Sequence, residues 1–182
     1  MARLPYVDPA TAPEAVRSIL EKLPAQLNVF RMMAHAETDF RPLIQLGGAI
    51  LSQQALSPKL RELTILRVGR LSPAEYEWVQ HVPIALATGA TQAQIDALAA
   101  DDVTGPAFDD VERAVLAFVT DVVRNVKASD ATFAAVGKFL GHREIVELVV
   151  TTGYYMLVAR LLETTGVDLD RPMGTRIVDS LT

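Results

Sequence analysis

SPKLRELTILRVGRLSPAEYEWVQH, residues 57–81, contains two Ser-Pro pairs. Each pair is a helix start signal, because serine caps the free backbone N–H groups and proline fits the first helical position. Ser57-Pro58 therefore begins a helix that continues to Leu71, and Ser72-Pro73 begins a second that runs to about Thr88. Two starts separated by one helix length predict an antiparallel helical hairpin.

The rest of the chain shows the same helical period. Apolar residues recur at spacings of three and four, and no segment has the two-residue alternation of a strand. Further helices are predicted over 13–23, 38–54 with Thr38 as N-cap, 91–99 with Thr91, 109–127 with Asp109, 129–140 with Ser129, and 142–165. The fold class is therefore all-α, a helical bundle built around the hairpin.

The chain has 182 residues, which fits one domain, 1–182, with an irregular lead over 1–12 and a tail over 166–182. The last helix is apolar almost all round from Ile145 to Leu162, which predicts a place at the centre of the core or in a subunit interface. A weak repeat relates Arg61-Glu62-Leu63 to Arg143-Glu144-Ile145. It indicates two degenerate helical halves, although chance explains it equally well.

Composition excludes several functions. Seventeen basic and 22 acidic residues give a net charge of −5, and the basic residues are scattered, so no nucleic-acid partner is expected. Cysteine is absent, which excludes disulfides, thiolate metal sites and thiol catalysis. Pro5, Asp8 and Pro9 interrupt the N-terminal region where a signal peptide needs an apolar run. We expect a cytoplasmic protein with no membrane partner.

The hairpin carries the most informative titratable residues. Glu62 lies on an apolar stripe, so it should be buried and should need a hydrogen-bond donor. Antiparallel pairing of the two helices brings His81 close to Glu62. Such a pair is suited to acid–base chemistry, with the histidine transferring the proton and the glutamate fixing its tautomer.

Glu77 and Tyr76 extend this candidate site. Glu77 precedes His81 by one helical turn, so the two side chains share a face, and Tyr76 can donate a further hydrogen bond. If both Glu62 and Glu77 approach His81, we expect the imidazole to be held in its protonated form. The alternative is that Glu77 and His81 form an ordinary exposed pair. Trp78 is a candidate for substrate contact or a core anchor.

Other kinds of site have weaker support. Two glutamates and one histidine can ligate a divalent cation, but the chain has no H-E-x-x-H motif. It also has neither the G-x-S-x-G motif of serine hydrolases nor a glycine-rich nucleotide loop. His35 and His142 lie in polar surroundings typical of the surface. We therefore expect no metal and no cofactor.

The segment LSPKLRELTILRVGRLSPAEYEWVQHVPIALATGATQAQIDAL, residues 56–98, resembles the carboxymuconolactone decarboxylase family, which includes the alkylhydroperoxidase D-like proteins. The likeness extends more loosely through YYMLVARLLETTGV near the C-terminus. The family's peroxidase branch uses a glutamate, a C-x-x-C and a histidine. In this sequence Glu62 and His81 occupy the first and last of these positions, and Ala74 and Glu77 stand where the cysteines would be. The resemblance implies a cysteine-free branch without thiol peroxidase activity.

The resemblance also implies a function. The family's decarboxylases form an enolate-like carbanion that must be protonated, which His81 oriented by Glu62 would do without a cofactor. Arg61, Arg67 and Arg70 are the cations available for a carboxylated substrate. Family members assemble into homo-oligomers, so a trimer or hexamer is expected. The alternative function is a non-catalytic oligomer that binds a small ligand or a protein partner.

Overall fold

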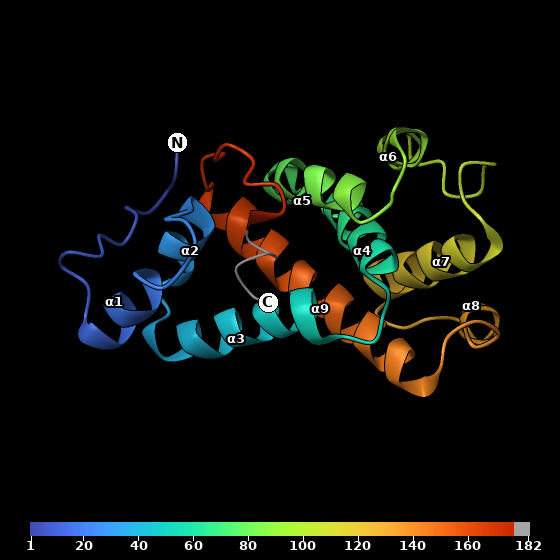
Figure 1. The fold of residues 1–182 in the computed structure, drawn as a ribbon, viewed down its shortest axis with the longest axis horizontal. Coiled ribbons are helices and arrows are strands. Elements are labelled where there is room, and N and C mark those ends of the chain that lie inside the picture. Colours follow the sequence, from blue (N-terminus) through green and yellow to red (C-terminus); the bar gives the residue numbers. More distant parts are fainter. Residues whose placement is uncertain (177–182) are drawn as a thin grey trace.

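The protein is built from α-helices, and the computed structural model describes residues 1–176. Figure 1 shows α9 crossing the molecule between the N-terminal helices α1–α3 on one side and α4–α8 on the other. No strand occurs in the described part of the chain. The helices are α1 (Glu14–Leu20), α2 (Asn28–Met33), α3 (Glu37–Gln53), α4 (Pro58–Leu71), α5 (Glu75–Ala87), α6 (Gln92–Ala99), α7 (Asp110–Asn125), α8 (Asp130–Val136) and α9 (His142–Thr165).

The predicted hairpin is confirmed as α4 and α5, which pack closely together along their lengths. Oγ of Ser57 accepts from the backbone N–H of Leu60 at 3.3 Å, as expected of an N-cap next to a helix-starting proline. The second arm begins at Glu75 rather than Pro73. Residues 72–74 are needed to reverse the chain, and the N–H of Ala74 donates to the carbonyl of Gly69 at 2.9 Å.

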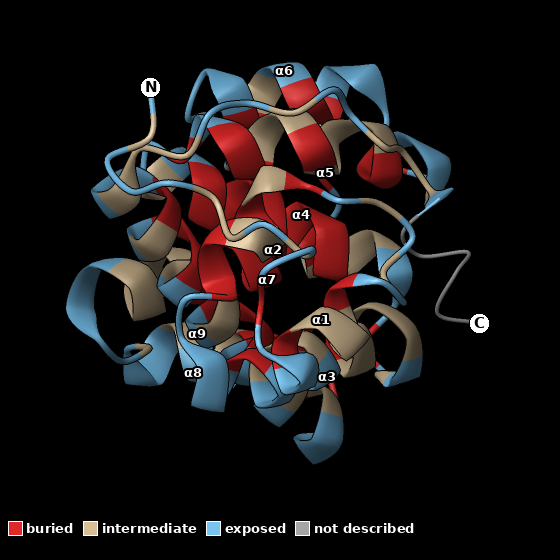
Figure 2. Ribbon diagram, turned by 90° about the vertical axis from the view of Figure 1, so that its left-hand side faces the viewer, coloured by how far each residue is buried: buried red, intermediate tan, exposed pale blue. Residues whose placement is uncertain are grey.

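α4 is the most deeply buried helix, with residues 61–69 all inaccessible to solvent. Figure 2 shows buried residues concentrated on α4 and its neighbours, whereas α8 and the outer side of α3 are exposed. Three apolar clusters surround these central helices. The first joins α3, α4, α7, α8 and α9 around Ile65 and Phe118. The second joins α1, α2, α3 and α9 around Phe40, and the third joins α4–α7 around Leu66 and Leu98.

α9 has the predicted bounds and ends at Gly166, whose φ of +63° favours glycine. Only one side of it is buried, because an outward stripe remains exposed at Val146, Val149, Val150 and Leu157. Within residues 1–176, α9 is the single helix long and apolar enough to cross a membrane, by length and composition only. A core helix meets the same criterion, so α9 is not enough to indicate a membrane protein.

Local signals placed most of the other helices, with three notable differences. Thr91, Asp109 and Ser129 cap α6, α7 and α8 as predicted, but α8 ends earlier, at Val136. The predicted cap Thr38 is wrong, because α3 begins at Glu37 and has no side-chain cap. α2 was not predicted, and its N-cap residue also makes no side-chain bond.

The C-terminal region is not a free tail over the part that the structure describes. Asp168 pairs with the N-terminal ammonium group at 3.1 Å and accepts from the hydroxyl of Tyr6 at 3.0 Å. Asp170 accepts from the backbone N–H of Asn28 at 2.6 Å. These contacts join residues 168–170 to the N-terminal segment before α1 and to the start of α2. The end of the predicted tail, residues 177–182, lies outside the described residues.

Candidate functional site

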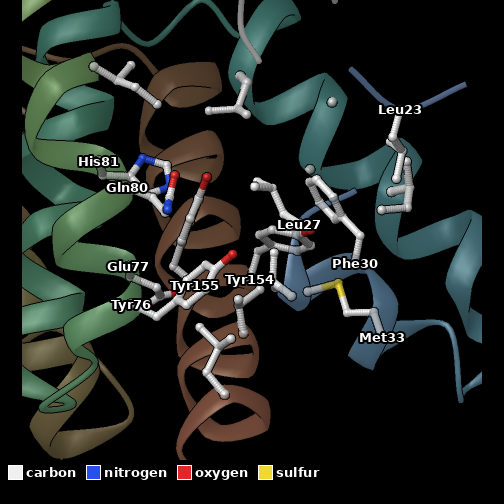
Figure 3. A pocket seen from close by; sticks show the side chains of 18 of the residues that line it. Leu23, Leu27, Phe30, Met33, Tyr76, Glu77, Gln80, His81, Tyr154 and Tyr155 are labelled. Carbon is white, nitrogen blue, oxygen red and sulfur yellow. The ribbon is translucent and has the colours of Figure 1, made fainter. Parts of the chain in front are cut away.

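A cavity of about 120 Å³ separates the hairpin helix α5 from the N-terminal helices. Figure 3 shows side chains from three directions around it: α5 with His81 and Glu77, α9 with Tyr154, and the N-terminal region with Phe30. Its lining is predominantly apolar. The lining residues are Leu23, Pro24, Leu27, Val29, Phe30, Met33, Ile44, Gly47, Gly48, Leu51, Tyr76, Glu77, Gln80, His81, Ile84, Tyr154, Tyr155, Val158 and Leu162.

Glu62 and His81 meet across the hairpin, as the sequence predicted. Nδ1 of His81 lies 2.8 Å from Oε2 of Glu62, and the Glu62 side chain is completely buried. Since a carboxylate is an acceptor, Nδ1 is the nitrogen that carries a proton in this contact. The His81 ring borders the cavity, and Nε2 has no hydrogen-bond partner among residues 1–176.

Arg61 neutralises Glu62 instead of contacting the cavity. Its Nε donates to Oε1 of Glu62 at 3.0 Å, and the Arg61 side chain is only 4% exposed. The two carboxylate oxygens of Glu62 are therefore shared between a guanidinium group and an imidazole. Arg61 was a candidate to bind a substrate carboxylate, but the structure does not place it among the residues that line the cavity.

Glu77 lies on the cavity wall, but it does not pair with His81. Both of its carboxyl oxygens are buried and have no hydrogen-bond partner within the described chain. Burial raises the pKa of Glu77 well above its usual value of 4.5, and the charge of Glu163 adds to this. Burial thus favours the neutral carboxylic acid form of Glu77 over the carboxylate. The expectation that it and Glu62 act together as two carboxylates on His81 is not met.

Three tyrosines complete the polar part of the wall. The Tyr155 ring packs edge-on against His81, with 5.0 Å between ring centroids. Tyr154 donates to the carbonyl of Leu43 at 3.2 Å, and burial, with a contribution from Glu77, raises the pKa of its hydroxyl to about 12. Burial also raises the pKa values of Tyr76 and Tyr155. All three are neutral hydroxyl groups at neutral pH.

Tyr76 and Gln80 link the cavity wall to the C-terminal segment. The hydroxyl of Tyr76 donates to Oδ2 of Asp170 at 2.6 Å. Nε2 of Gln80 donates to the carbonyl of Asp170 at 3.2 Å, and Oε1 of Gln80 accepts from the N–H of Met173 at 3.2 Å. The expected hydrogen-bonding role of Tyr76 is therefore filled within the protein. These two residues hold the wall in position.

Trp78 and the two remaining candidate arginines lie away from the cavity. Trp78 is partly buried and packs against the third apolar cluster, and it is not among the residues that line the cavity. Arg67 forms an ion pair with Asp101 and donates to Thr120, and Arg70 donates to the carbonyl of Ala99. None of the arginines proposed for an anionic substrate contacts the cavity.

Sequence reasoning missed the aromatic residues that α9 contributes. Tyr154 and Tyr155 lie in the last helix, which the sequence placed in the core or in a subunit interface and not at a site. The signal that points to them is two adjacent hydroxyl-bearing rings within a long apolar helix. The absence of a side chain at Gly47 makes room for Tyr154, because a Cβ there would lie 2.5 Å from the hydroxyl of Tyr154. Within residues 1–176, no group of three or more His, Cys, Asp or Glu side chains is arranged to hold a metal ion.

Comparison with known proteins agrees with this architecture. Residues 40–121, which include the Glu62–His81 pair, match the model of the Carboxymuconolactone decarboxylase family. The alkylhydroperoxidase AhpD core of an uncharacterized peroxidase-related protein from Ralstonia eutropha JMP134 superposes with a TM-score of 0.78 at 21% identity, covering 100% of this chain and 97% of that one. A comparison with curated proteins gave no match.

Two further solved structures share the fold. An uncharacterized peroxidase-related protein from Silicibacter sp. TM1040 has a TM-score of 0.77 at 18% identity, covering 93% of this chain and 92% of its own. A cysteine-to-alanine variant of the debrominase Bmp8, in complex with 2,3,4-tribromopyrrole, has a TM-score of 0.76 at 15% identity and full coverage of both chains. At these identities the comparisons show a common helical fold.

Proposed function

We propose that this chain, whose residues 40–121 match the model of the Carboxymuconolactone decarboxylase family, is a cofactor-independent acid–base lyase or isomerase that acts on a small organic molecule. His81 is the group that transfers the proton, and Glu62 is its positioning residue. The observation that carries this proposal is the 2.8 Å contact from Nδ1 of His81 to Glu62, which leaves Nε2 for a molecule in the cavity. A thiol peroxidase reaction is excluded because the chain has no cysteine.

The simplest reaction for this arrangement is proton transfer next to a carbonyl group. Nε2 of His81 takes a proton from the carbon beside the carbonyl, the C–H electron pair forms a double bond to the carbonyl carbon, and the π pair of the C=O bond moves onto the oxygen to give an enolate. The resulting imidazolium is stabilised by the Glu62 carboxylate, and it returns the proton to the same carbon or to a conjugated one. Atoms and charge balance without an added oxidant or reductant. A positioned proton-transfer group of this kind contributes about 10²- to 10⁴-fold in rate.

The cavity favours a small and uncharged substrate. Its volume of about 120 Å³ is close to that of apolar protein cavities that bind a benzene-sized ring. No lysine or arginine is among the lining residues, so a carboxylate would enter without a counter-charge other than a protonated His81. These features support neutral cyclic ketones and lactones over the carboxylated lactone of the family's name.

The alternative is a non-catalytic protein that holds a small ligand in the same cavity. Its support is the predominantly apolar lining, which suits binding without chemistry. The debrominase complex with tribromopyrrole is an example of this fold with a small ring compound bound. The two candidates differ in whether ligand binding depends on His81, because an apolar ligand needs the cavity and not the imidazole.

Proton transfer can be tested before the natural substrate is known. We would incubate the protein with cyclohexanone and with α-angelica lactone in D₂O and follow carbon-bound deuterium and double-bond position by NMR. Wild type should promote exchange or isomerisation, and His81→Ala and Glu62→Gln should lose most of it. His142→Ala, which changes an exposed histidine at the start of α9, is the matched control. Binding of these compounds with no exchange in wild type would favour the non-catalytic alternative.

The proposal includes assembly into a homo-oligomer, a trimer or hexamer. Its support is the exposed apolar stripe on α9, formed by Val146, Val149, Val150 and Leu157. Contiguous apolar surface of this kind marks interaction sites in soluble proteins. A second copy of the chain is the expected partner.

A further inference from the structure

Among residues 1–176, Glu77 is the only residue with side-chain polar atoms that are both fully buried and without a hydrogen-bond partner. The residue is 2% exposed, and both carboxyl oxygens lack a hydrogen-bond partner. Buried polar groups are nearly always hydrogen-bonded, since leaving one unpaired costs about 1–3 kcal/mol. Glu77 also lines the cavity, so a molecule in that cavity can supply the missing partner.

The surroundings of Glu77 determine its chemical form. Tyr154 and Tyr155 approach it from α9, close enough that a charge on Glu77 would raise the pKa values of both hydroxyl groups. Glu163 acts on it from the same helix, and no lysine or arginine is in the cavity lining. Burial and the Glu163 charge raise the pKa of Glu77, and both effects favour the protonated carboxyl group. A protonated carboxyl group has one O–H donor to offer.

We propose that Glu77 binds the carbonyl oxygen of an uncharged cyclic ketone or lactone, as a neutral O–H donor on the cavity wall beside His81. This inference rests on the proposed function, because it names the polar group of the substrate on which His81 acts. It assigns a ligand-binding role to a side chain that stands at a cysteine position of the family's peroxidase branch. The role requires the protonated form and no metal.

The spacing of Glu77 and His81 allows Glu77 to bind the carbonyl oxygen while His81 transfers the proton of the neighbouring carbon. Residues four apart on a helix lie on the same face, with Cβ atoms about 5–6 Å apart. A ring whose carbonyl oxygen accepts from Glu77 therefore places the neighbouring carbon on the side of His81. When that carbon loses its proton, negative charge develops on the oxygen already bound to Glu77. A donor fixed where charge develops lowers the barrier without reorganisation.

The same arrangement selects against charged ligands. A carboxylate ligand would meet another acidic group and no fixed cation in the lining. An ammonium ligand would instead favour the ionised form of Glu77 and take its proton away from the hydrogen bond. Preference for an amine is therefore the outcome most directly opposed to the proposal.

Infrared spectroscopy of bound cyclohexanone tests the hydrogen bond itself. Cyclohexanone labelled with heavy carbon at the carbonyl would be added to wild type, Glu77→Gln, Glu77→Leu and the control Glu75→Gln. Glu75 is exposed and outside the cavity lining. In wild type and in Glu75→Gln the carbonyl band should move to lower frequency than in hexane, and the band of the protonated Glu77 carboxyl should shift on binding.

The two Glu77 variants should distinguish the effect of losing the hydrogen-bond donor from the effect of changing the side-chain volume. Glu77→Gln keeps a weaker N–H donor, so the carbonyl shift should be smaller. Glu77→Leu removes the donor at similar volume, so the shift should vanish and cyclohexanone should bind about tenfold more weakly. Cyclohexane, which has the ring and no oxygen, should bind wild type and Glu77→Leu with equal affinity. If Glu77→Leu does not fold, the hydrogen bond is still tested by the carbonyl shift in Glu77→Gln and by the shift of the Glu77 carboxyl band in wild type.

Two results would overturn the inference. One is an unchanged carbonyl shift in Glu77→Leu, or in Glu77→Gln together with a silent carboxyl band. The other is tighter binding of cyclohexylamine than of cyclohexanone to wild type, lost in the Glu77 variants. Failure of the proposed function would give a different result. In that case the frequency of the bound carbonyl would still depend on Glu77, but the protein would show no proton exchange that depends on His81.

Discussion

Nδ1 of His81 on α5 lies 2.8 Å from Oε2 of Glu62 on α4, and the other oxygen of Glu62 accepts from Nε of Arg61 at 3.0 Å. The contact joins the two arms of the hairpin at the edge of the cavity. It holds the imidazole in one orientation with Nε2 available to a ligand. The hairpin is thus both the centre of the fold and the frame of the candidate site.

Removal of Arg61 should destabilise the protein strongly. Arg61→Met leaves the Glu62 carboxylate buried with His81 as its remaining partner, and breaking a buried ion pair from one side costs about 3–5 kcal/mol. The free energy of unfolding in urea measures this. Arg17→Met is the control, since Arg17 pairs with Glu14 at the surface and should change stability by less than about 1 kcal/mol. Equal losses in the two variants would show that Glu62 does not depend on Arg61.

Glu77 should make stability fall as pH rises. Its pKa is raised in the folded protein above the usual 4.5, so the folded state holds a proton that the unfolded state has released. Above pH 4.5, and up to the raised folded pKa, wild type should therefore lose up to about 1.4 kcal/mol per pH unit relative to Glu77→Gln. Urea unfolding of both proteins across this range gives the difference. Parallel pH profiles would mean that Glu77 is ionised in the folded protein.

Two helical glycines should respond to alanine with opposite signs. At Gly47 a Cβ would lie 2.5 Å from the hydroxyl of Tyr154, so Gly47→Ala should displace that ring and cost about 1–3 kcal/mol. At Gly69 a Cβ would meet its neighbours at 3.7 Å or more, which is ordinary contact. Gly69→Ala should therefore be neutral or stabilising by up to about 1 kcal/mol. Thermal unfolding of both variants checks this, and an equally tolerated Gly47→Ala would contradict the close approach of Tyr154.

A charge on the exposed stripe of α9 should separate the subunits. Val149→Asp places an acidic group in the middle of that stripe, and association should weaken about 100-fold, while the monomer keeps its helical content. Sedimentation velocity measures the oligomeric state. Val126→Asp is the control, because Val126 is 90% exposed at the end of α7. A monomeric wild type, or an oligomer unaffected by Val149→Asp, would show that α9 is not the interface.

Local signals in the sequence predicted the parts of the fold that depend on neighbouring residues. Ser57 and Asp109 cap their helices because a side-chain oxygen reaches a backbone N–H within the same turn. The Glu62–His81 contact was also predictable, since the length of the hairpin sets which residues of its two arms meet. α2 was missed because neither capping nor a clear period announces a helix of that length.

The rest of the site depends on long-range packing. Phe30, Gly47 and Tyr155 come from three helices far apart in the sequence, and only the tertiary fold brings them around one cavity. The isolation of Glu77 was not predictable either. Glu77 precedes His81 by one helical turn, which suggested that the two side chains interact, whereas in the structure the carboxyl oxygens of Glu77 have no hydrogen-bond partner. The pairing of Arg61 with Glu62 was likewise not predicted, and it engages an arginine that the sequence analysis had considered as a partner for a substrate carboxylate.

The central claim is that Glu62 holds the His81 ring with Nδ1 protonated, so that Nε2 is free to exchange a proton with a molecule in the cavity. Nitrogen-15 NMR of the His81 ring measures this directly, with assignment from His81→Ala. In the neutral imidazole of wild type, Nδ1 should carry the proton and Nε2 should be bare, and cyclohexanone should perturb Nε2 more than Nδ1. Glu62→Gln should abolish the preference. A neutral ring protonated at Nε2, or one unchanged in Glu62→Gln, would contradict the account.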